Sequence, residues 1–409
     1  MSRLPRQCAI LAGGLGTRLG ALTQATPKPL LDVGGRPFLG WLMREALRWG
    51  IEEFLLLTGH LGDRVQMQVG ELTASLPRSV PIRVSNEATP AGTGGALHHA
   101  LRMLDEHFLL LNGDSLFLAD LGPALAGFAH DTSDTLCRMV LRSVPDAGRY
   151  GVASLQGDRV SAFRERPHSS GPGLINSGVY LMDRRVAARA GPACSLERDL
   201  LPKLIVERAV RGTIAEGWFI DIGIPTDLTR ARAELPGRVR RPALFLDRDG
   251  VLNHDHGWVG SRERWEWMTG ATDAVRLATA AGFHVFVVTN QAGVARGLYT
   301  EDDVRHLHDW MGQALREAGG TVDDLRYCPF HPEATIPSYN VVSDWRKPGP
   351  GMLLDLIRTW ELDPARCLMV GDTQHDMAAA SAAGVAGYLF PGGDLAAFIS
   401  PLLRSRQSP

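Results

Sequence analysis

The chain has 409 residues, of which 44% are hydrophobic and 22% charged, so it can bury two or three globular cores. Its 43 lysines and arginines balance 45 aspartates and glutamates, which excludes a net positive field that would favour nucleic acid or a membrane. No run of about 18 apolar residues or signal-peptide pattern is present, and the five cysteines are scattered without a CxxC pair. We therefore expect a reduced, cytoplasmic protein that acts on small molecules, as a monomer or a homo-oligomer.

Apolar segments alternate with stretches of helical spacing along the first half of the chain. Strands are predicted within 7–14, 52–60 and 107–114, a helix within 38–50, and a second strand-rich stretch from about 149 to 182. This alternation predicts a parallel α/β sheet. The ligands of such sheets gather at the carboxyl ends of the strands.

Three glycines follow the first predicted strand. Gly13, Gly14 and Gly16 allow backbone N–H groups to approach a phosphate, and Arg18 and Lys28 add positive charge. The glycines match neither the lysine-bearing P-loop nor the dinucleotide fingerprint. On the glycines alone, a phosphate site and an ordinary turn are equally supported.

The segment GGLGTRL at 13–19, followed by PKP at 27–29, resembles the sugar nucleotidyltransferase family. The resemblance extends over about the first 230 residues through PAGTGGAL, NGDS, INSGVY and WFIDIGIPTDL. It implies a nucleotide-diphospho-sugar transferase fold, in which a sugar 1-phosphate attacks the α-phosphorus of a nucleoside triphosphate and releases pyrophosphate. The implied nucleotide contacts are Ala12, Gly13, Gly14, Gly16, Thr17, Arg18, Lys28, Glu87, Gly92, Thr93 and Asp114, with Arg18 and Lys28 also catalytic. The implied sugar-phosphate contacts are Glu165, Arg166, Asn176 and Gly178.

Two distant aspartates are candidate magnesium ligands of this first site. Asp114 and Asp221 each follow an apolar strand, and Mg²⁺ takes one or two carboxylates together with substrate phosphates. Aspartates in such places also serve as turn formers or helix caps, which the joint occurrence with the glycine loop disfavours. One position departs from the family, because many relatives carry lysine where this chain has Arg166.

The pattern breaks near Glu234, where a short, basic, turn-rich stretch precedes a new strand. We expect a transferase domain over 1–236, a linker over 237–241 and a second domain over 242–409. Two Rossmann-like, doubly wound α/β domains are therefore predicted.

The second domain opens with a strand that ends in Asp247 and Asp249. Residues two apart in an extended chain face the same side, so one carboxylate can attack phosphorus while the other handles protons. Two close carboxylates need a cation, and Asp372 and Asp376 at a later strand end complete a magnesium site.

The sequence order of these aspartates with Thr289 and Lys347 resembles the haloacid-dehalogenase-like (HAD-like) phosphatases over about 242–395. The resemblance implies Asp247 as nucleophile, Asp249 as general acid and base, and Thr289, Asn290 and Lys347 as phosphate contacts. It implies magnesium ligands at Asp247, Asp249 and Asp372, with Asp249 binding through its carbonyl.

Within these two families the closest subgroups look like heptose-1-phosphate guanylyltransferases and heptose-1,7-bisphosphate 7-phosphatases. Arg346, beside Lys347, would then help to hold a second anionic group. For His254 and His256, a place at the substrate entrance and a place on the surface are equally supported. Many phosphatase relatives bind a structural zinc, but of its four ligands only Cys328 remains here, so no zinc is expected.

The fusion itself favours a heptose pathway, because removal of the 7-phosphate leaves the 1-phosphate that the first domain needs. A rival interpretation joins a hexose-1-phosphate nucleotidyltransferase to a histidinol-phosphate type of phosphatase. Another makes the first domain a nucleotide-sugar sensor that regulates the phosphatase. Intact Arg18, Lys28, Asp114 and Asp221 disfavour the sensor.

Overall fold

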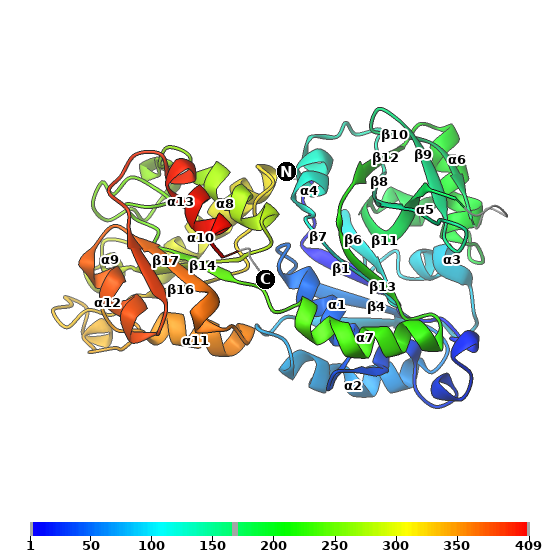
Figure 1. The fold of residues 1–409 in the computed structure, drawn as a ribbon, viewed down its shortest axis with the longest axis horizontal. Coiled ribbons are helices and arrows are strands. Elements are labelled where there is room, and N and C mark those ends of the chain that lie inside the picture. Colours follow the sequence, from blue (N-terminus) through cyan, green and yellow to red (C-terminus); the bar gives the residue numbers. More distant parts are fainter. Residues whose placement is uncertain (1–2, 166–170, 407–409) are drawn as a thin grey trace. The chain divides into compact units, whose positions relative to one another are not determined.

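The computed structural model describes residues 3–165 and 171–406. The chain divides into two compact units, Met1–Val239 and Arg240–Pro409 (Figure 1). Among the described residues, no helix is long and apolar enough to cross a membrane.

The first unit is built on a nine-stranded sheet of order β5-β4-β1-β6-β11-β8-β12-β10-β9. Its strands are β1 (Gln7–Leu11), β4 (Glu53–Thr58), β5 (Ile82–Asn86), β6 (His107–Asn112), β8 (Cys137–Val144), β9 (Val152–Gln156), β10 (Arg159–Arg164), β11 (Gly173–Asp183) and β12 (Val210–Ile214). The α/β class is confirmed. The predicted parallel arrangement is correct for β5 to β6 and for the pair β8 and β12, whereas β11 runs antiparallel to both β6 and β8. Among the described residues, no helix separates β9, β10 and β11, and such direct connections favour antiparallel neighbours.

Two small antiparallel pairs complete the strands of this unit. They join β7 (Ser115–Ala119) to β13 (Gly217–Asp221), and β2 (Asp32–Val33) to β3 (Arg36–Pro37). The helices are α1 (Phe38–Leu47), α2 (Gly62–Ala74), α3 (Gly92–His99), α4 (Gly122–His130), α5 (Arg185–Arg189), α6 (Leu201–Val206) and α7 (Pro225–Arg238). Short 3-10 turns η1 (Thr17–Thr23) and η2 (Lys28–Leu30) and a π-helical turn η3 (Leu196–Leu200) lie between them.

Helix α7 corrects the predicted break near Glu234. The helix continues through Pro236 to Arg238 because Leu228, Ala231 and Leu235 keep one buried face. The ring of Pro236 packs at Gly34, where a Cβ would lie 2.3 Å from the proline Cγ. The turn-rich linker therefore begins later than the sequence suggested.

The second unit holds a five-stranded sheet of order β16-β15-β14-β17-β18, in which all pairs are parallel. The strands are β14 (Ala243–Leu246), β15 (His284–Asn290), β16 (Asp324–Cys328), β17 (Cys367–Gly371) and β18 (Ala386–Leu389). The first strand in sequence lies in the middle, so the chain winds in both directions from β14. Doubly wound sheets bind ligands at the carboxyl end of that switch point.

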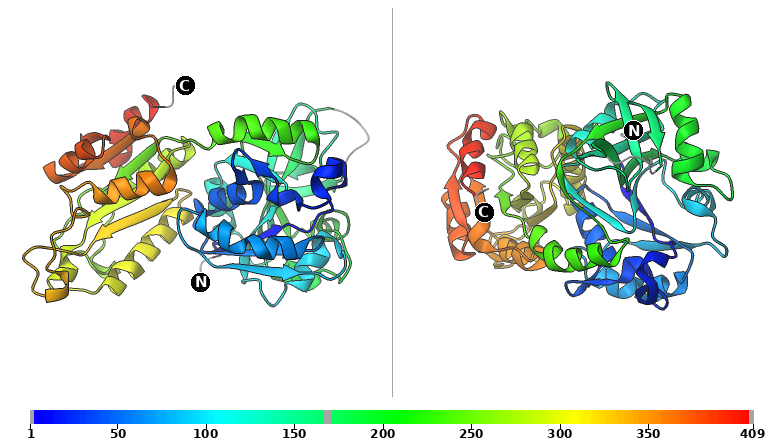
Figure 2. Two further views of the ribbon diagram at one scale, coloured as in Figure 1. Left: turned by 90° about the horizontal axis from the view of Figure 1, so that it is seen from below. Right: turned by 45° about the vertical axis from the view of Figure 1, so that its right-hand side comes forward.

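Helices flank this sheet as expected for a doubly wound unit (Figure 2). They are α8 (Ala271–Ala280), α9 (Ala292–Ala295), α10 (Glu301–Glu317), α11 (Gly351–Trp360), α12 (Gln374–Ala382) and α13 (Leu395–Arg404), with short turns η4 (Arg262–Arg264), η5 (Pro337–Tyr339) and η6 (Pro364–Arg366). Helix α10 begins directly after Thr300. Thr300 forms a capping box with Asp303, which satisfies free N–H groups at the start of α10.

Candidate active sites

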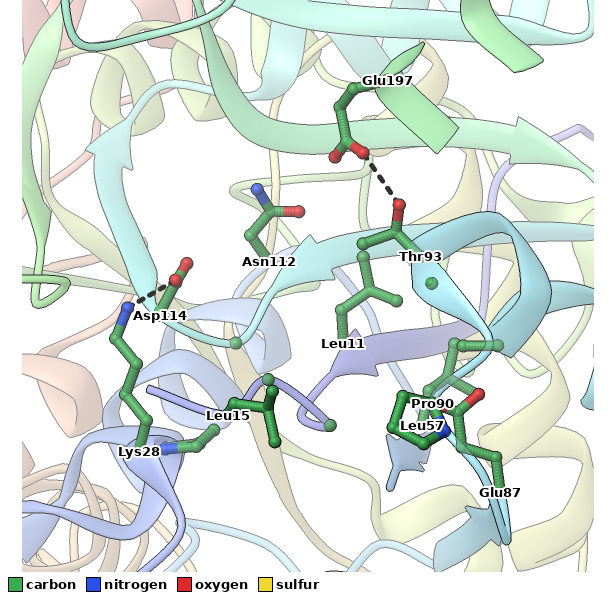
Figure 3. Close-up of a pocket in the computed structure, with 16 residues that line it drawn as sticks. Leu11, Leu15, Lys28, Leu57, Glu87, Pro90, Thr93, Asn112, Asp114 and Glu197 are labelled. Atoms are coloured by element: carbon green, nitrogen blue, oxygen red, sulfur yellow. Dashed lines mark hydrogen bonds and ion pairs between the residues drawn. The ribbon is translucent and has the colours of Figure 1, made fainter. Parts of the chain in front are cut away.

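The first cavity has a volume of about 330 Å³ and lies where β1 gives way to the glycine loop (Figure 3). Strand β1 pairs with β4 on one side and β6 on the other, so the loop lies at a switch point of the sheet. The cavity is lined by Leu11, Gly13, Gly14, Leu15, Lys28, Pro29, Leu57, Glu87, Pro90, Gly92, Thr93, Ala96, Asn112, Gly113, Asp114 and Glu197. Seven of the expected nucleotide contacts are in this set: Gly13, Gly14, Lys28, Glu87, Gly92, Thr93 and Asp114.

Lys28 joins the two candidate metal ligands of the first unit. Its Nζ lies 2.6 Å from Asp114 Oδ2 and 3.8 Å from Asp221 Oδ1. The two aspartates meet because β7 and β13 pair antiparallel, which sets Asp221 opposite Ser115. Residues 107 positions apart in the sequence are thus gathered around one ammonium group.

The charges at this point are unequal. Burial alone would raise the pKa of Asp114, but Lys28 outweighs burial and the pKa is lowered. Burial and the nearby Asp114 raise the pKa of Asp221. Asp114 therefore holds the charge that pairs with Lys28, whereas Asp221 lacks a full counter-charge. A divalent cation beside both carboxylates would supply it.

The remaining expected nucleotide contacts lie outside the lining of the cavity. Ala12 is buried, while Gly16, Thr17 and Arg18 belong to the turn that follows. Gly16 has φ 64° and its carbonyl accepts the Thr23 hydroxyl, so this glycine shapes the turn. Arg18 points toward Gly223, where an added Cβ would lie 2.9 Å from Arg18 Nη2 and 3.3 Å from Lys28 Nζ.

Glu87 stands at the far end of the cavity from Asp114 (Figure 3). Its Oε1 accepts a long hydrogen bond from the Ala91 N–H at 3.4 Å. Its Oε2 is buried and has no hydrogen-bond partner among the described residues. Burial raises the pKa of this carboxyl. A buried acceptor without a donor is costly and suits a ligand that brings N–H groups.

Two lining residues of the first cavity, Asn112 and Glu197, were missed by sequence reasoning. Asn112 Oδ1 is buried without a partner in the described chain, and the side chain lies between Asp114 and Glu197 (Figure 3). Thr93 donates to Glu197 Oε2 at 2.8 Å, so its hydroxyl orients Glu197. Asn112 could have been found, since it is the last residue of the apolar strand that leads to Asp114, and polar residues at strand ends line such sites. Glu197 reaches the cavity only through tertiary packing.

Three of the four expected sugar-phosphate contacts of the first unit lie among the described residues. Gly178 has φ 76° and packs against Asn112, where an added Cβ would lie 2.8 Å from the amide nitrogen. Asn176 donates to the Tyr180 hydroxyl and accepts from the Gly178 N–H, so its side chain shapes the same turn. Glu165 Oε2 lies 3.6 Å from Arg198 Nε. Arg166 lies outside the described residues.

The second cavity, of about 250 Å³, lies at the carboxyl end of β14 in the second unit. It is lined by Asp247, Asp249, Asp255, Gly257, Trp258, Thr289, Asn290, Tyr299, Lys347, Asp372, Thr373 and His375. The expected phosphatase residues Asp247, Asp249, Thr289, Asn290, Lys347 and Asp372 all belong to it. Asp255, Trp258, Tyr299 and His375 were not predicted.

Three carboxylates converge beside this cavity, and two of them, Asp247 and Asp372, line it. Asp247, Asp372 and Asp376 can present oxygens that all lie within 4.8 Å of one another. Lys347 Nζ lies 2.8 Å from Asp247 and 2.5 Å from Asp376. Oxygen donors so arranged fit Mg²⁺, which prefers carboxylates. Asp249 is not in this group, because its carboxylate turns toward Arg248.

The nucleophile candidate is protonated more readily than a free aspartate. Burial raises the pKa of Asp247 to about 7, with Lys347 opposing the shift. For Asp376, burial also raises the pKa, but Lys347 outweighs it and the net shift is downward. The ion pair in this state is therefore Lys347 with Asp376. A cation at the three carboxylates would favour the ionised form of Asp247, which is the attacking form.

The side chains of two expected phosphate contacts, Asn290 and Lys347, form hydrogen bonds with backbone groups. The Asn290 side chain donates to the Lys347 carbonyl and accepts from the Lys347 N–H, both at 3.0 Å. Lys347 Nζ also donates to the Val288 carbonyl at 3.0 Å. These bonds tie the loop of Lys347 to the end of β15, where Thr289 lies.

Arg346 and the loop of the two histidines lie near this cavity. Arg346 Nη1 is buried with no hydrogen-bond partner among described residues, and burial lowers the pKa of its guanidinium, with repulsion from Arg296 adding to the effect. His254 and His256 stack at 6.0 Å, and His256 pairs with Glu266. The part of this loop that lines the cavity is Asp255, Gly257 and Trp258.

The loop that carries zinc in many relatives is held here by side-chain packing. Glu301 accepts the Tyr327 hydroxyl at 2.7 Å and the Tyr339 hydroxyl at 3.0 Å. Phe330 packs on Tyr339, with ring centroids 6.1 Å apart. Trp345 packs against Gly351, where an added Cβ would lie 2.8 Å from the indole.

Glu301→Ala should lower the free energy of unfolding of the second unit by about 2 kcal/mol, since two hydroxyls lose a charged acceptor. Denaturant titration followed by phosphatase activity measures the change. Asp302→Ala is the matched control, because that exposed residue on the same helix turn pairs only with Arg305. Equal effects of the two variants would contradict this role of Glu301.

Comparison with known proteins agrees with these two sites. A family model described as nucleotidyl transferase matches residues 8–237, and a HAD-like hydrolase model matches residues 344–397. A heptose-1,7-bisphosphate 7-phosphatase of Rhodopseudomonas palustris is 51% identical over 168 residues, which cover 41% of this chain and 93% of that protein. The chain belongs to the nucleotidyl transferase family and to the family of these HAD-like phosphatases.

Two further proteins are similar to parts of the chain. The Escherichia coli K12 heptose-1,7-bisphosphate 7-phosphatase is 44% identical over 144 residues, covering 35% of this chain and 75% of that protein. A crystal structure of HddC from Yersinia pseudotuberculosis complexed with GMP-PN is 29% identical and covers 56% of this chain and 99% of that chain, with a TM-score of 0.49. The nucleotidyl transferase and phosphatase memberships make the protein an enzyme with both activities.

Proposed function

We propose that the protein is a bifunctional enzyme of nucleotide-heptose synthesis. The second unit removes the 7-phosphate of a heptose 1,7-bisphosphate, and the first transfers a nucleotidyl group, GMP from GTP, to the resulting heptose 1-phosphate. The observation that carries this proposal is the 51% identity to a heptose-bisphosphate phosphatase in a chain that also belongs to the nucleotidyl transferase family. The product of one reaction is the acceptor of the other.

In the phosphatase reaction, Asp247 attacks phosphorus and forms an aspartyl phosphate. Lys347, Thr289 and Asn290 hold the phosphoryl oxygens, and Asp249 protonates the departing sugar oxygen before it activates water. Mg²⁺ held by Asp247, Asp372 and Asp376, together with the Asp249 carbonyl, would neutralise charge on the phosphate. Arg346 Nη1, which has no hydrogen-bond partner among the described residues, suits the second phosphate of a bisphosphate.

In the transferase reaction, the sugar-phosphate oxygen attacks the α-phosphorus in line and pyrophosphate departs. Lys28 and Arg18 balance the charge that develops on the phosphates. Asp114 and Asp221 would hold Mg²⁺, which would neutralise negative charge on the phosphates. Asn112 and Glu197 supply acceptors for sugar hydroxyls, and Glu165 and the Asn176–Gly178 turn border the sugar phosphate.

Guanine preference is supported by the chemistry of Glu87. The Watson–Crick edge of guanine presents two adjacent donors, N1–H and the 2-amino group, which match one carboxylate. The buried, unpaired Oε2 of Glu87 provides such an acceptor at the end of the cavity away from the phosphates.

The test incubates the full chain with heptose 1,7-bisphosphate, Mg²⁺ and each nucleoside triphosphate in turn, and identifies the products by mass. We expect GDP-heptose and inorganic phosphate, with GTP preferred. Histidinol phosphate and hexose 6-phosphates serve as competing phosphatase substrates. Equal turnover of those monophosphates would contradict the heptose assignment and favour the rival pairing of activities.

A further inference from the structure

The carboxylate of Asp249 is surrounded by donors that fix its direction. Arg248 Nη2 donates to both of its oxygens at 2.9 Å, and Asn253 donates to Oδ1 at 3.0 Å. Arg248 is fully buried and is itself held by the Val259 carbonyl and His308. These contacts anchor one side of the carboxylate. Its Oδ2 accepts one more hydrogen bond, from a residue that lies far away in the sequence.

That donor is Gln291, which immediately follows β15. Its Nε2 donates to Asp249 Oδ2 at 2.9 Å and to Thr289 Oγ1 at 2.8 Å. The side chain is 1% exposed, so solvent cannot replace these bonds. A carboxylate only accepts, which requires the amide nitrogen of Gln291 to face Asp249. The amide oxygen must then face away from it.

Tyr299 meets that amide oxygen. Its hydroxyl donates to Gln291 Oε1 at 2.9 Å. Burial raises the pKa of Tyr299 to about 12, so the hydroxyl keeps its proton at neutral pH. Two glycines make room for the ring, because a Cβ on Gly260 or on Gly293 would lie 2.2 Å from Tyr299 atoms. The ring has a built slot, and the amide orientation follows from it.

We propose that Gln291 is a positioning residue for the phosphatase reaction, which aims the Asp249 carboxyl at the departing sugar oxygen and is itself oriented by Tyr299. This inference rests on the proposed role of Asp249. It adds two residues to the proposed mechanism: Gln291, which contacts Asp249 and Thr289, and Tyr299, which contacts Gln291. Arg248 and Asn253 hold one side of the carboxylate, and Gln291 fixes the rotation about its axis.

The test compares two kinds of leaving group. A sugar alkoxide needs a proton as it departs, whereas 2,4-dinitrophenolate leaves as a stable anion and does not. The kcat/KM value reports the steps up to leaving-group departure, so its ratio between heptose 1,7-bisphosphate and 2,4-dinitrophenyl phosphate isolates the aim of Asp249. A merely structural defect lowers both values and leaves the ratio unchanged.

Gln291→Met keeps the length of the side chain and removes the amide. We expect it to lower this ratio about 10-fold, which is less than the roughly 10²- to 10⁴-fold contribution of general acid catalysis as a whole, because Arg248 and Asn253 still hold the carboxyl group. Tyr299→Phe keeps the ring in its slot and should lower the ratio about threefold, since only the orientation of the amide is freed. Gln313→Met, on α10 and hydrogen-bonded through its side chain to Glu317, is the matched control and should leave the ratio unchanged.

Equal losses on both substrates would place the effect on phosphate binding through Thr289 and overturn the inference. If Gln291→Met fails to fold, Tyr299→Phe decides, and an unchanged ratio in that variant overturns it. Asp249→Asn tests the acid role of Asp249 separately from the positioning role of Gln291 and Tyr299. If Asp249→Asn itself leaves the ratio unchanged, the proposed acid is wrong. If Asp249→Asn lowers the ratio and the Gln291 and Tyr299 variants do not, only the positioning role fails.

Discussion

Asp247→Asn is expected to lower phosphatase turnover on the order of 10³-fold or more, while nucleotidyl transfer to supplied heptose 1-phosphate is retained. The amide has the shape of the carboxyl group but cannot form an aspartyl phosphate. Phosphate release from the bisphosphate and pyrophosphate release from GTP with heptose 1-phosphate measure the two activities separately. Asp273→Asn, an exposed aspartate of α8 that pairs only with Arg276, is the matched control.

The stability of this variant has a predictable sign. A carboxyl whose folded pKa is raised to about 7 stabilises the fold fully below the unfolded pKa of about 4 and loses that contribution as pH rises toward 7. Asparagine is neutral throughout, so without metal Asp247→Asn should melt at or above the temperature of the parent chain at pH 8. Loss of both activities together would contradict the independence of the two sites. A lower melting temperature of the variant at pH 8 would contradict the raised pKa of Asp247.

Much of the phosphatase site was predictable because its residues follow apolar strands. Asp247, Thr289 and Asp372 each end a buried segment, and parallel strands bring their carboxyl ends together. Lys347 lies in a loop, and its place was predicted from the resemblance alone. The orientation of Asp249 could not be predicted, since it depends on Gln291 and on tertiary contacts across more than 40 positions.

The transferase sheet was predicted less well for a physical reason. Apolar runs identify strands but not their direction, and β11 enters between β6 and β8 antiparallel to both. The place of Glu197 in the cavity could not be predicted either. Glu197 contacts Thr93 from 104 positions away and lies on a π-helical turn without a strand pattern. The pattern break predicted near Glu234 falls within α7, which continues through Pro236 to Arg238.

Asp221→Ala is expected to reduce nucleotidyl transfer on the order of 10² to 10³-fold and to leave the phosphatase unchanged. The reason is electrostatic. Lys28 Nζ lies 2.6 Å from Asp114 Oδ2 but 3.8 Å from Asp221 Oδ1, so the ammonium group neutralises Asp114 more fully than Asp221. Asp221 is therefore the carboxylate that a cation would neutralise. Pyrophosphate release with heptose 1-phosphate and GTP, over a range of Mg²⁺ concentrations, measures the loss.

Asp221→Asn refines this prediction, because the Asp221 carboxylate also accepts the Gly223 N–H at 2.6 Å. Asparagine keeps that acceptor and removes the charge, so it should lose transfer as severely as alanine if the charge is what matters. Asp227→Ala, a neighbour on α7 that pairs with Arg149, is the matched control and should retain transfer. Full activity in Asp221→Asn would reduce Asp221 to a turn-forming residue, and then Asp114 alone would be left to hold a cation beside the triphosphate.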